Sequence, residues 1–302
     1  MLKGRLGLET ARVPHADRHG LLWLERGRLS AEDGTLRFVC AGGGDLDAGD
    51  YAIPFQMVSF ICLGPGSAVT QDALRLLARH GTGLAAVGEH GVRLYASMPF
   101  GPDASALARR QALAWGDPVA RVALARRMYA WRLGEILPQT DLNALRGIEG
   151  ARMKEIYRRL AQQYGVAWVG RRYDREQPER DDEANQALNH AATAVQGAAL
   201  LAVAATGAIP QLGFIHEDSG ISFCLDVADL FRDSITVPIA FGAVRDAQRT
   251  PAEPMERIVR RLAGRTLHDK KVIPSMIDRI KEMFPAGAAN PEPLTALADP
   301  CP

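Results

Sequence analysis

Short hydrophobic runs separated by glycine-containing turns fill the chain up to residue 98. Their composition is typical of strands, because short runs rich in residues that favour strands lie between turn signals. Predicted strands lie at residues 21–24, 35–40, 56–63, 84–87 and 92–97, with a hairpin turn at 31–34. One helix is predicted from Gln71 to His80, because Thr70 can cap its start and Gly81 its end. The pattern therefore predicts a small β domain with one helix over residues 1–98.

Beyond residue 102 the hydrophobic positions recur at helical spacing. In the segment 150–164 one face carries Met153, Tyr157 and Leu160, which predicts an amphipathic helix. Further helices are predicted at residues 109–115, 119–133, 183–206, 233–246, 254–262 and 274–284. We therefore expect an α+β protein, with an all-α catalytic domain at 103–284 and a flexible proline- and alanine-rich tail at 285–302.

Composition indicates the class of protein but does not identify a binding partner. The chain has 302 residues, 47% of them hydrophobic and 24% charged, and a net charge of +1, so a soluble protein is expected and overall charge indicates no ligand. The four cysteines are scattered and form no C-x-x-C pair, which favours a reducing, cytoplasmic setting and disfavours a cysteine zinc site. The longest apolar stretch, residues 191–209, contains polar residues and is expected to be a buried helix, not a membrane span.

One carboxylate stands out because glycines lie on both sides of it. Glu149 falls between Gly147 and Gly150, at the predicted start of the 150–164 helix. Acidic residues are common in first helical turns, where they favour the helix dipole, so a purely structural role explains Glu149 equally well. The glycines favour function slightly, since they let a substrate approach the backbone closely.

A pair of acidic residues and a histidine follow within eighty residues of Glu149. Asp226 and Asp229 lie three apart, so on a helix they share a face and repel each other unless a cation, a proton or an arginine intervenes. A solvated helix would explain the pair without any site, but the surrounding residues are hydrophobic. His216 ends an apolar run, where most histidines are structural. Together with Glu149, these groups are ligands that suit Mg²⁺ or Mn²⁺.

Basic residues crowd two segments of the second domain. Residues 146–175 contain eight Lys or Arg against three acids, and residues 257–281 contain eight against two. Solvated helix faces usually mix the two signs, so these segments indicate a polyanionic ligand. With aromatic residues interleaved in the first segment, nucleic acid is the favoured ligand.

Several motifs, in this order, resemble one protein family. They are Gly64-Pro65-Gly66, Val87-Gly88-Glu89-His90-Gly91-Val92-Arg93-Leu94-Tyr95-Ala96-Ser97, Arg146-Gly147-Ile148-Glu149-Gly150, Tyr164-Gly165-Val166-Ala167-Trp168, Gly170-Arg171-Arg172-Tyr173-Asp174, Gly213-Phe214-Ile215-His216 and Leu225-Asp226-Val227-Ala228-Asp229. The chain resembles the CRISPR-associated spacer integrases, the Cas-one family, in the subtype I-E form, over residues 20–285.

The resemblance implies a defined assembly and reaction. Family members are homodimers, and two dimers flank a dimer of the small Cas-two partner in a heterohexameric complex. The complex holds double-stranded DNA with 3′ overhangs and joins its 3′-OH ends to CRISPR repeat DNA by transesterification. The reaction needs Mg²⁺ or Mn²⁺ and no membrane.

The resemblance also assigns residues. The implied metal ligands are Glu149, His216 and Asp229, with Asp226 as a further catalytic acid. The implied DNA-binding residues are Arg75, Arg93, Lys154, Tyr173 and Arg232. The chain departs from the family pattern at Ser219 and Ala68, where basic residues are familiar, and at Arg26, where a tyrosine braces the duplex end.

Two other interpretations stay open from the sequence. A structure-selective, metal-dependent DNA nuclease would use the same residues without integrating DNA. A non-catalytic DNA scaffold would need the acids only to balance arginine.

Overall fold

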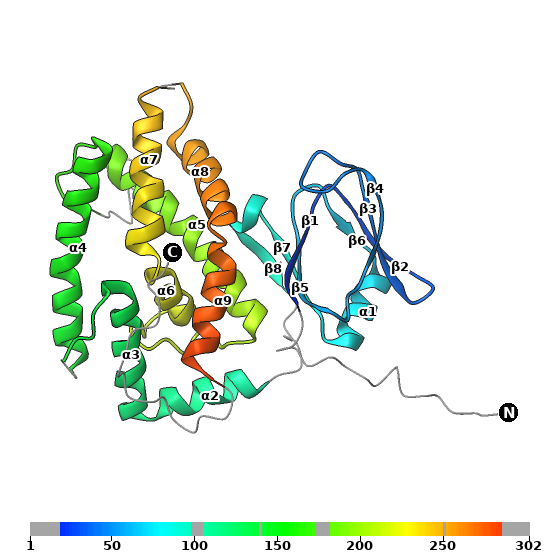
Figure 1. Ribbon diagram of the computed structural model, residues 1–302, viewed down its shortest axis with the longest axis horizontal. Helices are drawn as coiled ribbons and strands as arrows, with labels where there is room; N and C mark the ends of the chain where they lie inside the picture. The colour runs from blue at the N-terminus through cyan, green and yellow to red at the C-terminus, as the bar shows by residue number, and fades with distance from the viewer. Residues whose placement is uncertain (1–18, 98–104, 139–140, 173–181, 250–251, 286–302) are drawn as a thin grey trace. The chain divides into compact units, whose positions relative to one another are not determined.

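The computed structural model describes residues 19–97, 105–138, 141–172, 182–249 and 252–285 (Figure 1). The chain divides into a β unit, residues 1–88 with 94–105, and a helical unit, residues 89–93 with 106–302. This arrangement confirms the predicted α+β class, with a β-rich N-terminal part and a helical C-terminal part. The tail expected at 285–302 falls almost entirely outside the described residues, as does the segment that joins the two predicted domains.

Two four-stranded sheets build the β unit. The elements are β1 (His19–Leu24), β2 (Gly27–Glu32), β3 (Thr35–Cys40), β4 (Gly49–Ile53), β5 (Val58–Leu63), β6 (Ala68–Val69), α1 (Gln71–His80), β7 (Gly83–Val87) and β8 (Leu94–Ser97). The first sheet has the order β1-β5-β7-β8 and the second the order β4-β3-β2-β6. Pairs β1–β5, β5–β7 and β2–β6 are parallel, while β2–β3, β3–β4 and β7–β8 are antiparallel.

The hairpin between β2 and β3 shows how the local sequence determines a turn in the β unit. Asp33 and Gly34 take positive φ angles of 49° and 76°, the conformation that a two-residue hairpin turn requires. Leu29, Phe38 and Leu77 are fully buried in one hydrophobic cluster, which closes the core between the sheets and α1. The predicted strands and the helix 71–80 are confirmed. The list of predicted strands lacks β2, β4 and β6, and β4 was missed because its sequence is short and contains glycine and aspartate.

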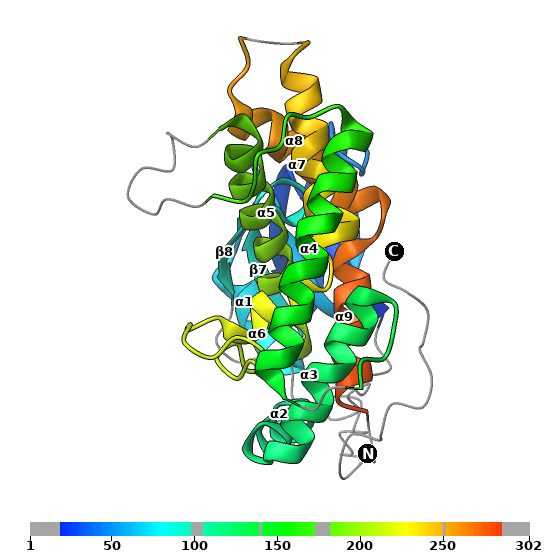
Figure 2. The same ribbon diagram turned by 90° about the vertical axis from the view of Figure 1, so that its left-hand side faces the viewer.

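The helical unit is arranged around one long helix. Its elements are η3 (Glu89–Gly91), α2 (Ser105–Gly116), α3 (Pro118–Leu133), α4 (Leu142–Tyr164), α5 (Glu183–Thr206), α6 (Ser222–Asp229), the π-helical turn η5 (Arg232–Thr236), α7 (Val237–Ala247), α8 (Met255–Asp269) and α9 (Val272–Met283). Helix α5 packs against α6, α7, α8 and α9 (Figures 1 and 2). Its alanines and Gly197 allow close approach: a Cβ at Gly197 would lie 2.6 Å from the Val92 carbonyl oxygen.

Among the described residues, one helix, α5, is long and apolar enough to cross a membrane, judged by its length and composition alone. In the apolar window, 61% is buried inside the protein, as in the core helix of a folded domain. This agrees with the expectation of a buried helix in this region.

Helix α4 begins earlier than the sequence predicted. Asp141 caps it, with its carboxylate accepting the Ala144 N–H, and the helix then runs through both glycines to Tyr164. Glu149 therefore lies in the third turn, not at the helix start, and the prediction was wrong on this point. The helix dipole favours acidic residues only in the first turn of a helix. A favourable interaction with the dipole therefore does not explain the presence of Glu149.

Candidate active site

The candidate residues come from three parts of the helical unit. Glu149 is on α4, His216 is in the loop that leads into α6, and Asp226 and Asp229 are on α6. Helix α3 packs along α4 and adds an arginine, Arg132 (Figure 2). The structure thus brings together side chains that are up to 97 residues apart in the sequence.

Asp226 organises the loop that carries His216. Its side chain is completely buried, and its Oδ2 accepts hydrogen bonds from the backbone N–H groups of Phe214 and Ile215 at 2.5 and 3.1 Å. Its Oδ1 accepts the backbone N–H of His216 at 2.9 Å. The turn needs a glycine at Gly213, because a Cβ there would collide with the His216 carbonyl oxygen. Asp226 therefore fixes the backbone of this loop. Both of its carboxylate oxygens are engaged in these hydrogen bonds, so neither is free to contact a substrate.

The same carboxylate also orients the imidazole of His216. Nδ1 of the ring lies 2.7 Å from Asp226 Oδ1, and Nε2 lies 3.9 Å from Asp229 Oδ2. The hydrogen bond to Asp226 raises the pKa of His216 above its usual value, against the opposing effect of burial. Nδ1 carries the hydrogen in this arrangement, so Nε2 is left as the free lone pair that faces Asp229.

Arg132 joins the two remaining acids. Its Nη2 lies 2.7 Å from Glu149 Oε1, and its Nη1 lies 3.8 Å from Asp229 Oδ2. The guanidinium is 5% exposed, while Glu149 and Asp229 are 21% and 20% exposed. Tyr129 on the same side of the site is buried, and this burial, followed by the Glu149 charge, raises the pKa of Tyr129 to about 12.

Two further arginines lie beside the carboxylates and the His216 loop. Arg232 begins the π-helical turn, and its Nη2 lies 2.9 Å from Asp229 Oδ1. Arg146 donates to the Ile215 carbonyl oxygen at 2.6 Å and is partly exposed. Short π-helical turns are rare and often occur at functional sites. Partly exposed cations around a carboxylate cluster are the arrangement expected where phosphate groups approach.

The donor set fits a divalent metal ion. His216 places one ring nitrogen on a carboxylate and keeps the other free, which is the usual arrangement of a metal-ligating histidine. Glu149 and Asp229 supply the oxygen ligands that Mg²⁺ and Mn²⁺ prefer. Within the described part of the chain, no three such side chains are already gathered as a metal centre, and Arg132 stands between the two acids.

The predicted DNA-binding residues lie in several places. Arg75 is exposed on α1 and pairs with Asp72 at 2.6 Å, and Lys154 is exposed on α4. Arg232 lies at the carboxylate cluster itself, as described above. Tyr173 falls outside the described residues.

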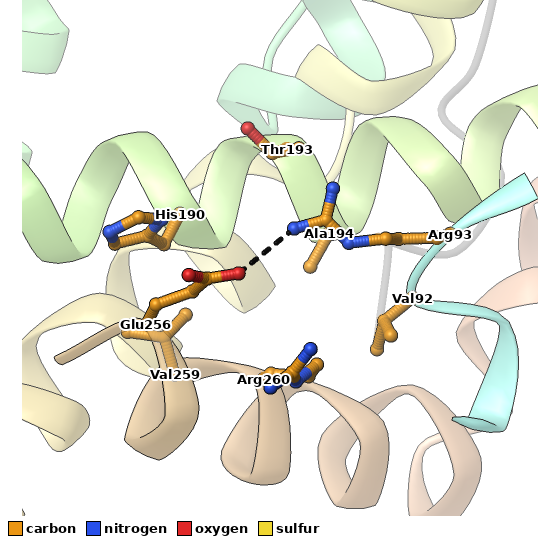
Figure 3. A pocket seen from close by; sticks show the side chains of 8 residues that line it. All are labelled: Val92, Arg93, His190, Thr193, Ala194, Glu256, Val259 and Arg260. Atoms are coloured by element: carbon orange, nitrogen blue, oxygen red, sulfur yellow. Dashed lines mark hydrogen bonds and ion pairs between the residues drawn. The ribbon is translucent and has the colours of Figure 1, made fainter. Parts of the chain in front are cut away.

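Arg93 lines a pocket between η3, α5 and α8, shown in Figure 3. Its Nη2 lies 3.2 Å from Glu256 Oε1, and both side chains are partly exposed. Arg260 and His190 line the same pocket, and burial lowers the pKa of His190. A phosphate that binds here meets two arginines, but it must compete with Glu256 for Arg93.

Sequence reasoning missed Arg132 as a site residue. The available signal was an arginine among Tyr129, Ala130, Trp131 and Leu133, where a helix face should be apolar. A charge in such a position is rarely buried unless it is paired, so it indicated a partner acid elsewhere in the chain.

Comparisons with known proteins show which family the chain is similar to. The family model described as CRISPR associated protein Cas1 matches residues 129–257. The chain is 36% identical to the CRISPR-associated endonuclease Cas1 of Escherichia coli (strain K12), covering 96% of this chain and 94% of that protein. It is 37% identical to the Cas1 of Geobacter sulfurreducens, covering 92% and 88%.

Solved structures show the same fold. The crystal structure of a TtCas1–DNA complex superposes with a TM-score of 0.80 at 32% identity, covering 90% of this chain and 98% of that one. A casposase bound to its integration product shares the fold, with a TM-score of 0.60 at 15% identity. The chain belongs to the Cas1 family of CRISPR-associated endonucleases.

Proposed function

We propose that this Cas1 protein joins the 3′-OH ends of protospacer DNA to CRISPR repeat DNA by transesterification, using Mg²⁺ or Mn²⁺. The observation that carries the proposal is that Glu149 and Asp229 both face the Arg132 guanidinium, while Nε2 of His216 lies 3.9 Å from Asp229 and the partly exposed Arg232 pairs with the same carboxylate. These three side chains would hold the ion. When bound, the ion neutralises charge on a phosphodiester and lowers the pKa of an attacking hydroxyl.

The reaction needs no nucleotide cofactor. The 3′ oxygen of the incoming strand forms a new P–O bond, and the 3′ oxygen of the repeat strand leaves with the proton that the attacking hydroxyl gave up. One phosphodiester bond is made for each one broken. Arg232 and Arg146, partly exposed at the opening, are placed to bind the oxygens of the scissile phosphate and its neighbours.

DNA binding is supported by the basic surface and by the relative solved with DNA. Arg75, Lys154, Arg93 and Tyr173 remain the proposed contacts to the duplex. The proposed substrate is double-stranded DNA with 3′ overhangs, because a duplex with single-stranded ends can place each 3′-OH in a buried site.

The assembly is also a proposal. One duplex has two ends, so one chain cannot serve both, and a homodimer supplies the second site. The β unit exposes Val39, Met57 and Tyr95, apolar surface that a subunit contact would cover. We further propose a cytoplasmic heterohexamer with Cas2, of the subtype I-E kind. Light scattering at micromolar concentration tests the dimer, and a monomer there would refute it.

The decisive experiment is strand transfer. Purified protein with Cas2, Mn²⁺ and a labelled 3′-OH duplex should attach the label to a supercoiled plasmid that carries the repeat. Glu149→Ala and Asp229→Ala should abolish joining without losing DNA binding. Glu155→Ala, on the exposed face of the same helix, is the matched control and should join DNA normally.

The same assay separates integration from a nuclease without integration. A duplex ending in a dideoxynucleotide has no 3′-OH, so it should give no joined product even though it binds. If the wild-type protein cuts both duplexes alike and joins neither, the enzyme is a metal-dependent nuclease and the proposal is wrong.

A further inference from the structure

Arg132 carries a charge that is almost removed from water. Its guanidinium is 5% exposed and faces two acids, Glu149 at 2.7 Å and Asp229 at 3.8 Å. Its Nε and Nη2 nonetheless make no hydrogen bond of acceptable geometry with any described residue. Charge and proximity therefore hold the guanidinium, not directed hydrogen bonds. A buried arginine with unsatisfied N–H groups is costly, which indicates a functional reason for its position.

The two acids that face Arg132, Glu149 and Asp229, are two of the three proposed metal ligands. Without a cation, neighbouring carboxylates repel each other. Arg132, together with Arg232 at 2.9 Å from Asp229, supplies the missing positive charge. A divalent ion at the same oxygens would face this positive charge at short range. The ion and the guanidinium therefore compete for Glu149 and Asp229.

The structure offers Arg132 a second set of partners. A cavity of about 190 Å³ opens beside it, lined by Trp131, Leu133, Gly134, Leu230, Asp233 and Ser234 as well as Arg132. The Ser234 hydroxyl is buried without a hydrogen-bond partner among the described residues, and Asp233 adds a carboxylate. A guanidinium that left Glu149 and Asp229 would find two acceptors on this side.

We propose that Arg132 is a built-in counter-ion that holds Glu149 and Asp229 in place in the metal-free protein. A divalent ion must displace it from them, towards Asp233 and Ser234. This inference rests on the proposed function, in which Glu149, His216 and Asp229 hold the ion. Arg132 is thus a positioning residue whose competition with the ion sets the metal affinity of the site.

The test measures metal binding, independently of DNA joining. Mn²⁺ is titrated into the full-length protein and followed by electron paramagnetic resonance, and thermal unfolding is recorded in EDTA and in Mn²⁺. Arg132→Met removes the competing charge, so it should bind Mn²⁺ at least about tenfold more tightly than wild type. It should also melt lower in EDTA and gain more from Mn²⁺ than the wild-type protein does.

Arg279→Met is the matched control. Arg279 is also buried, pairs with Glu282 at 2.8 Å and stacks over Trp131, and it is not a partner in the ion pairs described for Glu149, His216 and Asp229. This variant should lower the melting temperature equally in EDTA and in Mn²⁺ and should leave the Mn²⁺ affinity unchanged.

Asp233→Asn keeps Arg132 and tests the displacement separately. It removes the second anionic partner, so Mn²⁺ should bind more weakly, by about fivefold or more. If Arg132→Met fails to fold, this variant alone decides the proposal. Unchanged Mn²⁺ affinity in both variants, or weaker binding in Arg132→Met, would overturn the counter-ion role. A wild-type protein that binds no Mn²⁺ would instead refute the proposed function.

Discussion

Replacing Asp226 by asparagine should weaken metal binding at the site, although Asp226 is not itself a proposed metal ligand. In the wild-type protein, Asp226 Oδ2 accepts two backbone N–H groups, and Oδ1 accepts one more as well as Nδ1–H of His216. Asparagine has one oxygen and one NH₂ group. Its best orientation keeps the oxygen on Phe214 and Ile215 and turns the NH₂ towards His216.

That orientation changes the tautomer of His216. The amide NH₂ donates to Nδ1, so the ring hydrogen moves to Nε2, the nitrogen proposed to bind the ion. The His216 backbone N–H is left facing a donor on a fully buried side chain. Losing this hydrogen bond and weakening the others should cost about 2–4 kcal/mol of folding free energy. For a domain of this size, the melting temperature should fall by roughly 5–15 °C.

The change in tautomer should weaken Mn²⁺ binding by about 10- to 100-fold. Urea unfolding in EDTA measures the stability, and the ¹⁵N chemical shifts of His216 report which ring nitrogen carries the hydrogen. Asp218→Asn makes the same chemical change at an exposed position of the same loop and should alter neither measurement. The reasoning fails if Asp226→Asn keeps its stability within about 0.5 kcal/mol, or if Nε2 remains unprotonated.

The raised pKa of His216 adds a pH dependence with a defined sign. The folded protein binds this proton more tightly than the unfolded chain does. Its contribution to stability is therefore complete below the unfolded value, about 6.5, and is lost as the pH rises through the folded value. Metal binding follows the opposite trend, because the ion needs the neutral ring. In Asp226→Asn, both pH dependences should shift to lower pH.

Three further outcomes are expected. Glu256→Gln frees Arg93, so duplex affinity should rise by about two- to fivefold, whereas Glu253→Gln, which leaves Arg93 paired, should not change it; filter binding measures both. Arg93→Ala should weaken binding and reduce the slope of log affinity against log salt by about one, and an unchanged slope would remove Arg93 from the interface. Gly197→Ala places a methyl group 2.6 Å from the Val92 carbonyl oxygen, so urea unfolding should show a loss of about 1–3 kcal/mol.

Much of the fold could be predicted because its signals are local. The helix 71–80 has its cap residues at both ends, and the helix 183–206 was predicted with the bounds that the structure shows. Helix α4 was predicted to begin eight residues too late, and Gly147 and Gly150 lie inside it. Glycine weakens a helix by only about 1 kcal/mol, and the Asp141 cap and the packing against α3 outweigh that cost.

The site could be predicted only as a set of candidates. Spacing put Asp226 and Asp229 on one helix face, but it could not show that Asp226 is buried beneath the loop and that Asp229 faces His216. These differences depend on contacts between α6 and residues ten or more positions away. Arg132 was missed for the same reason, since its partners are on α4 and α6.

The charges of the assembled site suggest an order of binding. Glu149, Asp226 and Asp229 carry three negative charges, and Arg132 and Arg232 carry two positive ones. When His216 is neutral, the metal-free site therefore holds one excess negative charge. That charge attracts a divalent cation and repels a phosphodiester. With the ion bound the excess becomes one positive charge, which matches the single negative charge of the scissile phosphate.

Asp229→Asn tests this argument in a way that activity cannot. The variant removes the excess negative charge, so in EDTA it should bind a duplex with 3′ overhangs more tightly than wild type does. Adding Mn²⁺ should tighten DNA binding by the wild-type protein but have little effect on the variant. Fluorescence anisotropy in EDTA and in Mn²⁺ measures both differences. If the variant binds overhang DNA less tightly than wild type in EDTA, the excess charge does not control the order, and the argument from charge balance is wrong.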